Sequence, residues 1–228
     1  MEKCKARIDS VYNGSAVDGK GLRCVVFFTG CNMRCGFCHN PETWTEKGIE
    51  VTLPDLVARI KRYKSYIKNG GVTLSGGEPF LQANFCKELI KALHEENISV
   101  IIETNGLICD VGLIEVCDGI RLDIKNQERE INSKVFEFLD ICQAKDKYVT
   151  MTNVLVPTLN DTSDKLATLK SIKEKYSCIK EVKFLAFRKL CESKYDRLNK
   201  PFPYEKYEEG TRADLQKAYD ALGLTAVN

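Results

Sequence analysis

The chain has 228 residues, of which 43% are hydrophobic and 29% charged, and its formal net charge is +2. This length and apolar content suffice for one sizeable core, so we expect a single domain spanning residues 1–228. The near-neutral charge gives no electrostatic reason to expect nucleic acid or an anionic membrane as a partner, and we predict neither.

The elements predicted along the chain are apolar, β-branched runs that alternate with amphipathic stretches. The predicted strands are 22–29, 72–75, 99–103, 120–124, 148–156 and 180–187. The predicted helices are 53–67, 82–96, 108–117, 134–144, 162–176 and 213–222. This alternation predicts an α/β fold built from parallel β-α-β units. Six strands fit an incomplete (β/α)6 partial TIM barrel better than a closed barrel, with an open flavodoxin-like sheet as the alternative.

Two features of the sequence bear on its location. No stretch is long and apolar enough to span a membrane, and the first seven residues lack the apolar region of a signal peptide, so we expect a cytoplasmic protein. The chain has 11 cysteines, an odd count in a chain that is not small, which argues against a disulfide framework. Metal ligation together with buried thiols is the favoured interpretation.

A cysteine triplet follows the first predicted strand directly. Cys31, Cys35 and Cys38 offer three thiolates on one short loop, and the next cysteine, Cys86, lies inside a predicted helix. An electron-transfer [4Fe–4S] site needs four thiolates, so three would leave one iron open to a substrate or cofactor. A structural zinc site with His39 as the fourth ligand is the alternative, but such sites usually pair ligands from two separated segments.

Polar residues follow three further predicted strands. The second predicted strand leads into Ser75, Gly76, Gly77 and Glu78, which precede Pro79. The two glycines allow a sharp turn and a close approach of the backbone to a ligand, although an ordinary β–α turn can have the same sequence pattern. Glu103 ends the third strand, where a carboxylate can accept hydroxyl groups of a ligand or can be an ordinary solvated turn residue. Asp123 and Lys125 end the fourth strand on one face, with a surface ion pair as the alternative.

The C-x3-C-x2-C triplet after a first strand resembles the signature of the radical S-adenosylmethionine (SAM) superfamily. The resemblance implies one [4Fe–4S] cluster held by the triplet, whose open iron binds the amino and carboxylate groups of SAM. Reductive cleavage of SAM then gives a 5′-deoxyadenosyl radical that takes a hydrogen atom from the substrate. Because the cofactor carries this chemistry, no catalytic side chain is predicted. The residues implied to bind SAM are Asn40, Ser75, Gly76, Gly77, Glu78, Glu103, Asp123, Lys125 and Val154.

The segments 17–23 (VDGKGLR) and 38–44 (CHNPETW) resemble the glycyl-radical-enzyme activating enzymes of the pyruvate formate-lyase type. That resemblance runs from about Val17 to Asn160 and implies removal of an α-hydrogen from one backbone glycine of a partner enzyme. It places Asp18 and Arg23 at the partner's glycine loop and suggests flavodoxin or ferredoxin as the electron donor. Residues 39–70 contain no cysteine, so no ferredoxin-like insert is expected, and a monomer is predicted.

One position departs from that family's pattern. Arg188 stands where the pyruvate formate-lyase type has a histidine near SAM, and we assign it to the substrate loop set with Asp18 and Arg23. Alternatives therefore stay open: a radical SAM enzyme acting on a small molecule or peptide, an anaerobic ribonucleotide reductase activase, or a non-enzymatic metal-binding module.

Overall fold

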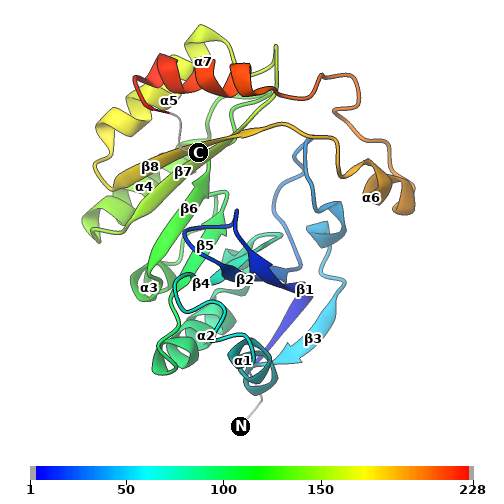
Figure 1. Ribbon diagram of the computed structural model, residues 1–228, viewed down its shortest axis with the longest axis vertical. Helices are drawn as coiled ribbons and strands as arrows, with labels where there is room; N and C mark the ends of the chain where they lie inside the picture. The colour runs from blue at the N-terminus through cyan, green and yellow to red at the C-terminus, as the bar shows by residue number, and fades with distance from the viewer. Residues whose placement is uncertain (1–3, 226–228) are drawn as a thin grey trace. The chain divides into compact units, whose positions relative to one another are not determined.

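The computed structural model describes residues 4–225 and shows an α/β protein built on one eight-stranded sheet. The strands lie in the order β3-β1-β2-β4-β5-β6-β7-β8, so the sheet is open, with β3 and β8 at its edges (Figure 1). Their bounds are β1 Lys5–Ser15, β2 Arg23–Phe28, β3 Ile49–Thr52, β4 Gly71–Gly76, β5 Val100–Thr104, β6 Gly119–Asp123, β7 Val149–Leu155 and β8 Ile179–Ala186.

The six predicted strands are β2 and β4 to β8, which confirms the α/β class and a sheet that does not close into a barrel. The pairs β2–β4, β4–β5 and β7–β8 are parallel. Two strands were not predicted. β1 pairs antiparallel with both β2 and β3, and it places Ile8 opposite Phe28 and Lys5 opposite Thr52.

The helices carry recognisable end signals. They are α1 Leu53–Lys61, α2 Ala83–Glu95, α3 Val111–Val116, α4 Ser133–Ala144, α5 Ser163–Lys175, α6 Glu192–Arg197 and α7 Arg212–Leu222, with short 3-10 helices η1 Pro41–Trp44 and η2 Pro79–Gln82. Thr52 caps α1 by accepting from the N–H of Asp55. Thr211 and Asp214 form a capping box at the start of α7, and Gly223 ends it in a left-handed conformation.

The described chain divides into two compact units. Unit 1 contains residues up to Arg34, 42–104 and 108–121; unit 2 contains residues 35–41, 105–107 and those from 122 onward. Strand β6 contributes to both. The single-domain boundaries therefore stay a prediction.

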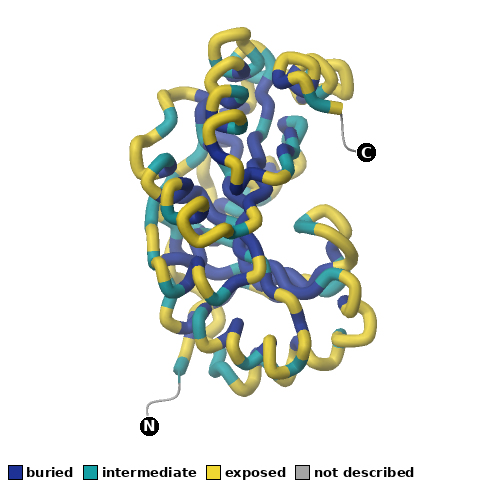
Figure 2. The backbone as a smooth tube through the Cα atoms, turned by 90° about the vertical axis from the view of Figure 1, so that its left-hand side faces the viewer, coloured by how far each residue is buried: buried dark blue, intermediate teal, exposed yellow. Residues whose placement is uncertain are grey.

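Each unit has its own buried core, and the buried stretches of the backbone are dark blue in Figure 2. In unit 1, β2 and β4 are buried almost throughout, as expected for parallel strands covered on both faces. In unit 2, α5 contacts α7, and α7 packs on β8 through an edge-to-face pair of Phe184 and Tyr219 at 5.1 Å.

Membrane-spanning helices and disulfides are both absent from the described residues. No helix within residues 4–225 combines the length and apolarity that crossing a membrane requires. The eleven cysteines all lie in that range, and no disulfide joins any two of them.

Candidate active site

The first cysteine of the triplet begins a loop that leaves β2 on unit 1. Gly30 turns the chain there at φ +89°, and its N–H donates to the carbonyl of Thr43 at 2.8 Å. Arg34 then donates to the carbonyl of Cys31 at 2.8 Å and lies 5.4 Å over the ring of Trp44. These contacts hold the main chain of Cys31, and its side chain is half-buried.

The Gly-Gly-Glu turn after β4 packs directly on the residue before Cys31. Gly76 has φ +105°, and a Cβ added to Gly77 would lie 2.0 Å from the carbonyl oxygen of Gly30, so both positions require glycine. The N–H of Glu78 donates to the same carbonyl at 2.8 Å. The carboxylate of Glu78 is fully buried and accepts from the hydroxyl of Thr104 at 2.8 Å. These contacts fix the turn on the cysteine loop of unit 1.

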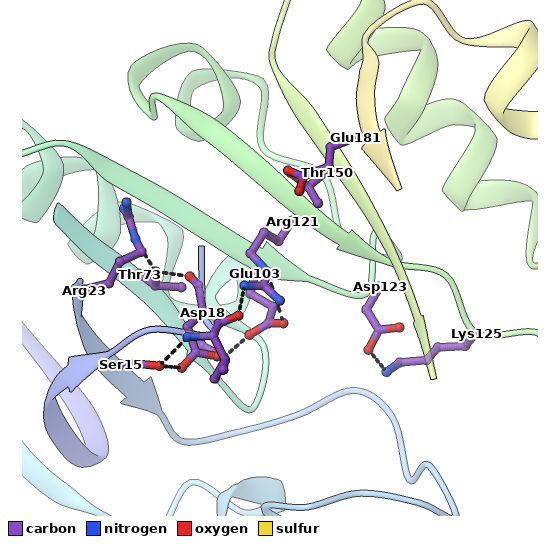
Figure 3. Close-up of polar contacts among 12 residues, drawn as sticks. Ser15, Asp18, Arg23, Thr73, Glu103, Arg121, Asp123, Lys125, Thr150 and Glu181 are labelled. Atoms are coloured by element: carbon purple, nitrogen blue, oxygen red, sulfur yellow. Dashed lines mark hydrogen bonds and ion pairs between the residues drawn. The ribbon is translucent and has the colours of Figure 1, made fainter. Parts of the chain in front are cut away.

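Glu103, at the end of β5, is oriented by a hydroxyl and a cation. Ser75 donates to one carboxylate oxygen at 2.7 Å, and the Nε of Arg121 lies 3.8 Å from the other (Figure 3). Arg121 is 4% exposed and donates through Nη1 to the carbonyl of Val17 at 2.7 Å. The side chain of Glu103 stays 23% exposed, so its oxygens can still accept hydroxyl groups of a ligand.

Arg23 is buried and does not reach outward. Its guanidinium donates to the hydroxyl of Thr73 at 2.7 Å and to the carbonyls of Gly70 and Val72, both at 2.6 Å. Thr73 in turn donates to the carbonyl of Asp18 at 2.7 Å (Figure 3). Burial, and next the charge of Arg121, lower the pKa of Arg23 to about 10. The role of Arg23 towards a substrate stays a prediction, and it would act by holding the loop that carries Asp18.

The other two cysteines lie on unit 2 beside a half-buried ion pair. The N–H of Cys38 donates to the carbonyl of Cys35 at 3.1 Å, which makes a tight turn. Lys125 donates to Asp123 (Figure 3) and lies 4.6 Å over the ring of Phe37. Burial raises the pKa of Cys35, and the charge of Lys125 opposes this. Burial alone would lower the pKa of Lys125, but the charges of Asp123 and Cys35 raise it overall, so the ammonium persists beside the thiols.

His39 and Asn40 are bound by residues that follow β8. The Nε2 of His39 lies 2.9 Å from the carbonyl of Arg188. Since a carbonyl only accepts, this bond places the proton on Nε2, and His39 could ligate zinc through that atom only by breaking it. The amide oxygen of Asn40 accepts from Lys194 at 2.9 Å. Arg188 itself is exposed and donates to the carbonyl of Gly210 at 2.7 Å.

Val154 lies near the end of β7 with its side chain half-buried. Its carbonyl accepts from Gln127 at 2.8 Å and from Asn160 at 2.9 Å. A network of buried amides therefore fixes the main chain at this point of unit 2, and a contact with adenine stays a prediction.

Comparison with known proteins decides the family. The 4Fe-4S single cluster domain matches residues 17–112, which include the whole triplet. A pyruvate formate-lyase-activating enzyme from Clostridium pasteurianum is 35% identical over 85% of this chain and 87% of its own length. The chain belongs to the pyruvate formate-lyase-activating enzyme family. A further member of this family, the pyruvate formate-lyase 1-activating enzyme of Escherichia coli K12, is 32% identical over 95% of this chain and 94% of its own.

Solved structures support the fold of this family member. QueE from Escherichia coli superposes with a TM-score of 0.56 at 16% identity, covering 86% of this chain and 92% of that one. A domain of a pyruvate-formate lyase-activating enzyme from Bacteroides vulgatus gives 0.55 at 17% identity, covering 69% of this chain and 98% of that one. These likenesses support the expected α/β class with a sheet that does not close into a barrel, although the sheet has eight strands instead of the six predicted.

The match to a 4Fe-4S single cluster domain points to an iron–sulfur cluster, and the donor set fits one. The triplet offers three sulfurs for a cluster, and Lys125 supplies a lasting positive charge beside two of them. No three His, Cys, Asp or Glu side chains within residues 4–225 are grouped closely enough to hold a metal ion. The ligand and SAM-binding residues, distributed over both units, therefore stay predictions.

Sequence reasoning missed several residues that support the candidate site. Arg121 orients Glu103, and Lys194 and Tyr195 bind the cysteine loop of unit 2. Arg121 could have been noticed, since it is a charged residue inside a short, otherwise apolar strand. Lys194 and Tyr195 gave no comparable signal because they lie in a polar segment far along the chain.

Proposed function

We propose that this chain activates a glycyl radical enzyme of the pyruvate formate-lyase type. When bound, SAM and a reduced cluster would supply a 5′-deoxyadenosyl radical, and the α-hydrogen atom of one backbone glycine would pass to it, giving 5′-deoxyadenosine and leaving the unpaired electron on the partner. The observation that carries the proposal is the 35% identity to a pyruvate formate-lyase-activating enzyme over most of both chains.

The proposed roles of the residues follow from their contacts. Cys31, Cys35 and Cys38 ligate three irons, and Lys125 offsets their negative charge near the carboxylate of SAM. The Gly-Gly-Glu turn offers its backbone and the buried Glu78 to the amino group of SAM. Glu103, held by Ser75, accepts the ribose hydroxyls. Asp123 orients Lys125, and Asn40 and Val154 complete the SAM-binding set.

The proposal extends to partners and location. A flavodoxin or ferredoxin donates the electron, and the chain acts as a monomer in the cytoplasm. Eleven cysteines without a disulfide are typical of a reducing compartment. Asp18 meets the glycine loop on unit 1, and the buried Arg23 holds the segment that carries Asp18 through Thr73. Arg188 on unit 2 is assigned to the same substrate set.

The test is an anaerobic incubation of the reconstituted protein with a co-encoded glycyl radical enzyme, SAM and a reductant. We expect a glycyl doublet in the electron paramagnetic resonance spectrum and stoichiometric 5′-deoxyadenosine. A Cys35→Ser variant is the matched control and should give neither.

Two outcomes would reject the proposal. SAM cleavage without a glycyl doublet would favour a small-molecule or peptide substrate. One zinc per chain without iron or sulfide after anaerobic purification would favour a non-enzymatic metal module instead.

A further inference from the structure

The chain between β8 and α7 is long and well packed. We call residues 187–207, which include α6, the aromatic segment. Phe187 stacks on Phe202 at 6.2 Å, and Tyr195 lies 5.0 Å from Phe202. Tyr204 lies 5.9 Å from Phe187. These four side chains are at most 8% exposed, so the segment has a core of its own. Long connections of this kind in compact proteins usually serve a function.

The aromatic segment binds three consecutive residues of the cysteine loop on unit 2. The hydroxyl of Tyr195 donates to the carbonyl of Cys38 at 3.2 Å. The main-chain carbonyl of Arg188 accepts from His39 at 2.9 Å, and Lys194 donates to Asn40 at 2.9 Å. Because the three bonds come from three different residues of the segment, they fix the orientation of the loop as well as its distance from the segment.

Packing reinforces these bonds at the preceding residues. The ring of Phe37 lies 5.9 Å from that of Tyr204, and both residues are buried. A Cβ added to Gly36 would lie 2.1 Å from a ring carbon of Tyr204. Gly36 is therefore the residue that lets this ring close on the turn between Cys35 and Cys38.

We propose that the aromatic segment positions the iron–sulfur site, with Tyr195 and Tyr204 setting the turn that carries two cluster ligands and Lys194 setting Asn40 for SAM. This rests on the ligand assignment of the proposed function. The aromatic core alone would be enough to pack the segment onto the fold. In addition, polar groups of Arg188, Lys194 and Tyr195 form hydrogen bonds to the residues that carry or follow a cluster cysteine. Groups one step removed from metal ligands commonly control how tightly the metal is held.

The first test measures how firmly the cluster is held. Tyr195→Phe removes one hydroxyl, and we expect the reconstituted cluster to be lost to an iron chelator about tenfold faster than in the wild type. Gly36→Ala should accelerate the loss further. Tyr219→Phe is the matched control, since its hydroxyl also binds the main chain of unit 2, accepting from the N–H of Phe184 at 3.2 Å.

The second test separates the two halves of the proposal. Lys194→Met should raise the dissociation constant for SAM severalfold and change the chelator rate less than Tyr195→Phe does, because Lys194 donates to the side chain of Asn40, whereas Tyr195 donates to the carbonyl of Cys38. Thermal unfolding of each variant shows whether the fold is retained. Chelator rates for Tyr195→Phe and Gly36→Ala equal to that of Tyr219→Phe would overturn the proposal. Both tests are read without the partner enzyme, so a loaded cluster that makes no glycyl radical would reject the proposed function and leave this inference standing.

Discussion

Glu103→Gln separates two tasks of this carboxylate, holding Arg121 and binding SAM. Glutamine keeps the size of the side chain and can still accept from Ser75, but it removes the charge that lies 3.8 Å from Arg121. A charge pair at this distance has a gross attraction of about 4 kcal/mol at an effective dielectric constant of about 20. Since the Glu103 side chain is 23% exposed, solvent screens part of it, and we expect a net loss of about 1–2 kcal/mol.

The same substitution should also weaken the binding of SAM. The glutamine amide is neutral and has one acceptor oxygen where the carboxylate has two, so the two ribose hydroxyls would lose about 1 kcal/mol of hydrogen-bond free energy each. The dissociation constant for SAM should therefore rise about 30-fold. The assay is anaerobic calorimetric titration of SAM into the reconstituted protein, with thermal unfolding in parallel, where a loss of 1 kcal/mol lowers the midpoint by about 2–4 °C.

Glu181→Gln is the matched control for this experiment. Glu181 on β8 is also partly buried and accepts from a hydroxyl, that of Thr150, at 3.2 Å. Its replacement should leave SAM affinity unchanged. A Glu103→Gln variant that melts earlier but binds SAM as tightly as the wild type would refute the ribose assignment and leave Glu103 as the partner of Arg121 alone.

Three further predictions concern stability. Arg23→Met removes a buried guanidinium that donates to two carbonyls and a hydroxyl, so it should cost about 3 kcal/mol in urea unfolding, and an unchanged midpoint would contradict the buried network. Gly77→Ala should cost about 1–3 kcal/mol by thermal unfolding, because its Cβ meets a carbonyl; a stability equal to the wild type would show that the turn can yield. Thr211→Ala should cost about 1 kcal/mol at pH 7. The hydroxyl of Thr211 also donates to Asp214 and lowers the pKa of that carboxyl, so this part of the loss is present above about pH 4 and disappears as the pH falls through the lowered pKa; an equal difference at pH 7 and pH 3 in thermal unfolding would argue against it.

The sequence predicted the central strands well because their apolar runs are continuous and end at turn residues. It missed β1, although Ala6, Ile8 and Val11 are buried in an approximately alternating pattern that is typical of a half-buried strand. It extended the first helix to residue 67, whereas α1 ends at Lys61 and the chain continues in turns towards Gly70. Helix ends are set by capping and by local turns, which hydrophobic periodicity does not report.

The sequence predicted those parts of the candidate site whose residues lie close together in the chain. The cysteine triplet and the Gly-Gly-Glu turn are local patterns, so their residues could be named from the sequence. The pairing of Glu103 with Arg121 and the bonds from Lys194 and Tyr195 to the cysteine loop join residues far apart in the chain. Such contacts depend on how strands and loops pack, and a single sequence does not show which distant residues form a pair.

The thiols outside the triplet differ from one another in chemical reactivity. Burial raises the pKa of Cys24 to about 11 and that of Cys86 higher still, so neither forms an appreciable amount of thiolate near neutral pH. Cys109, by contrast, is exposed. Alkylating reagents and oxygen should therefore reach Cys109 while these interior sulfurs are spared. During assembly, iron and sulfide meet few competing nucleophiles, which favours delivery to the loop after β2.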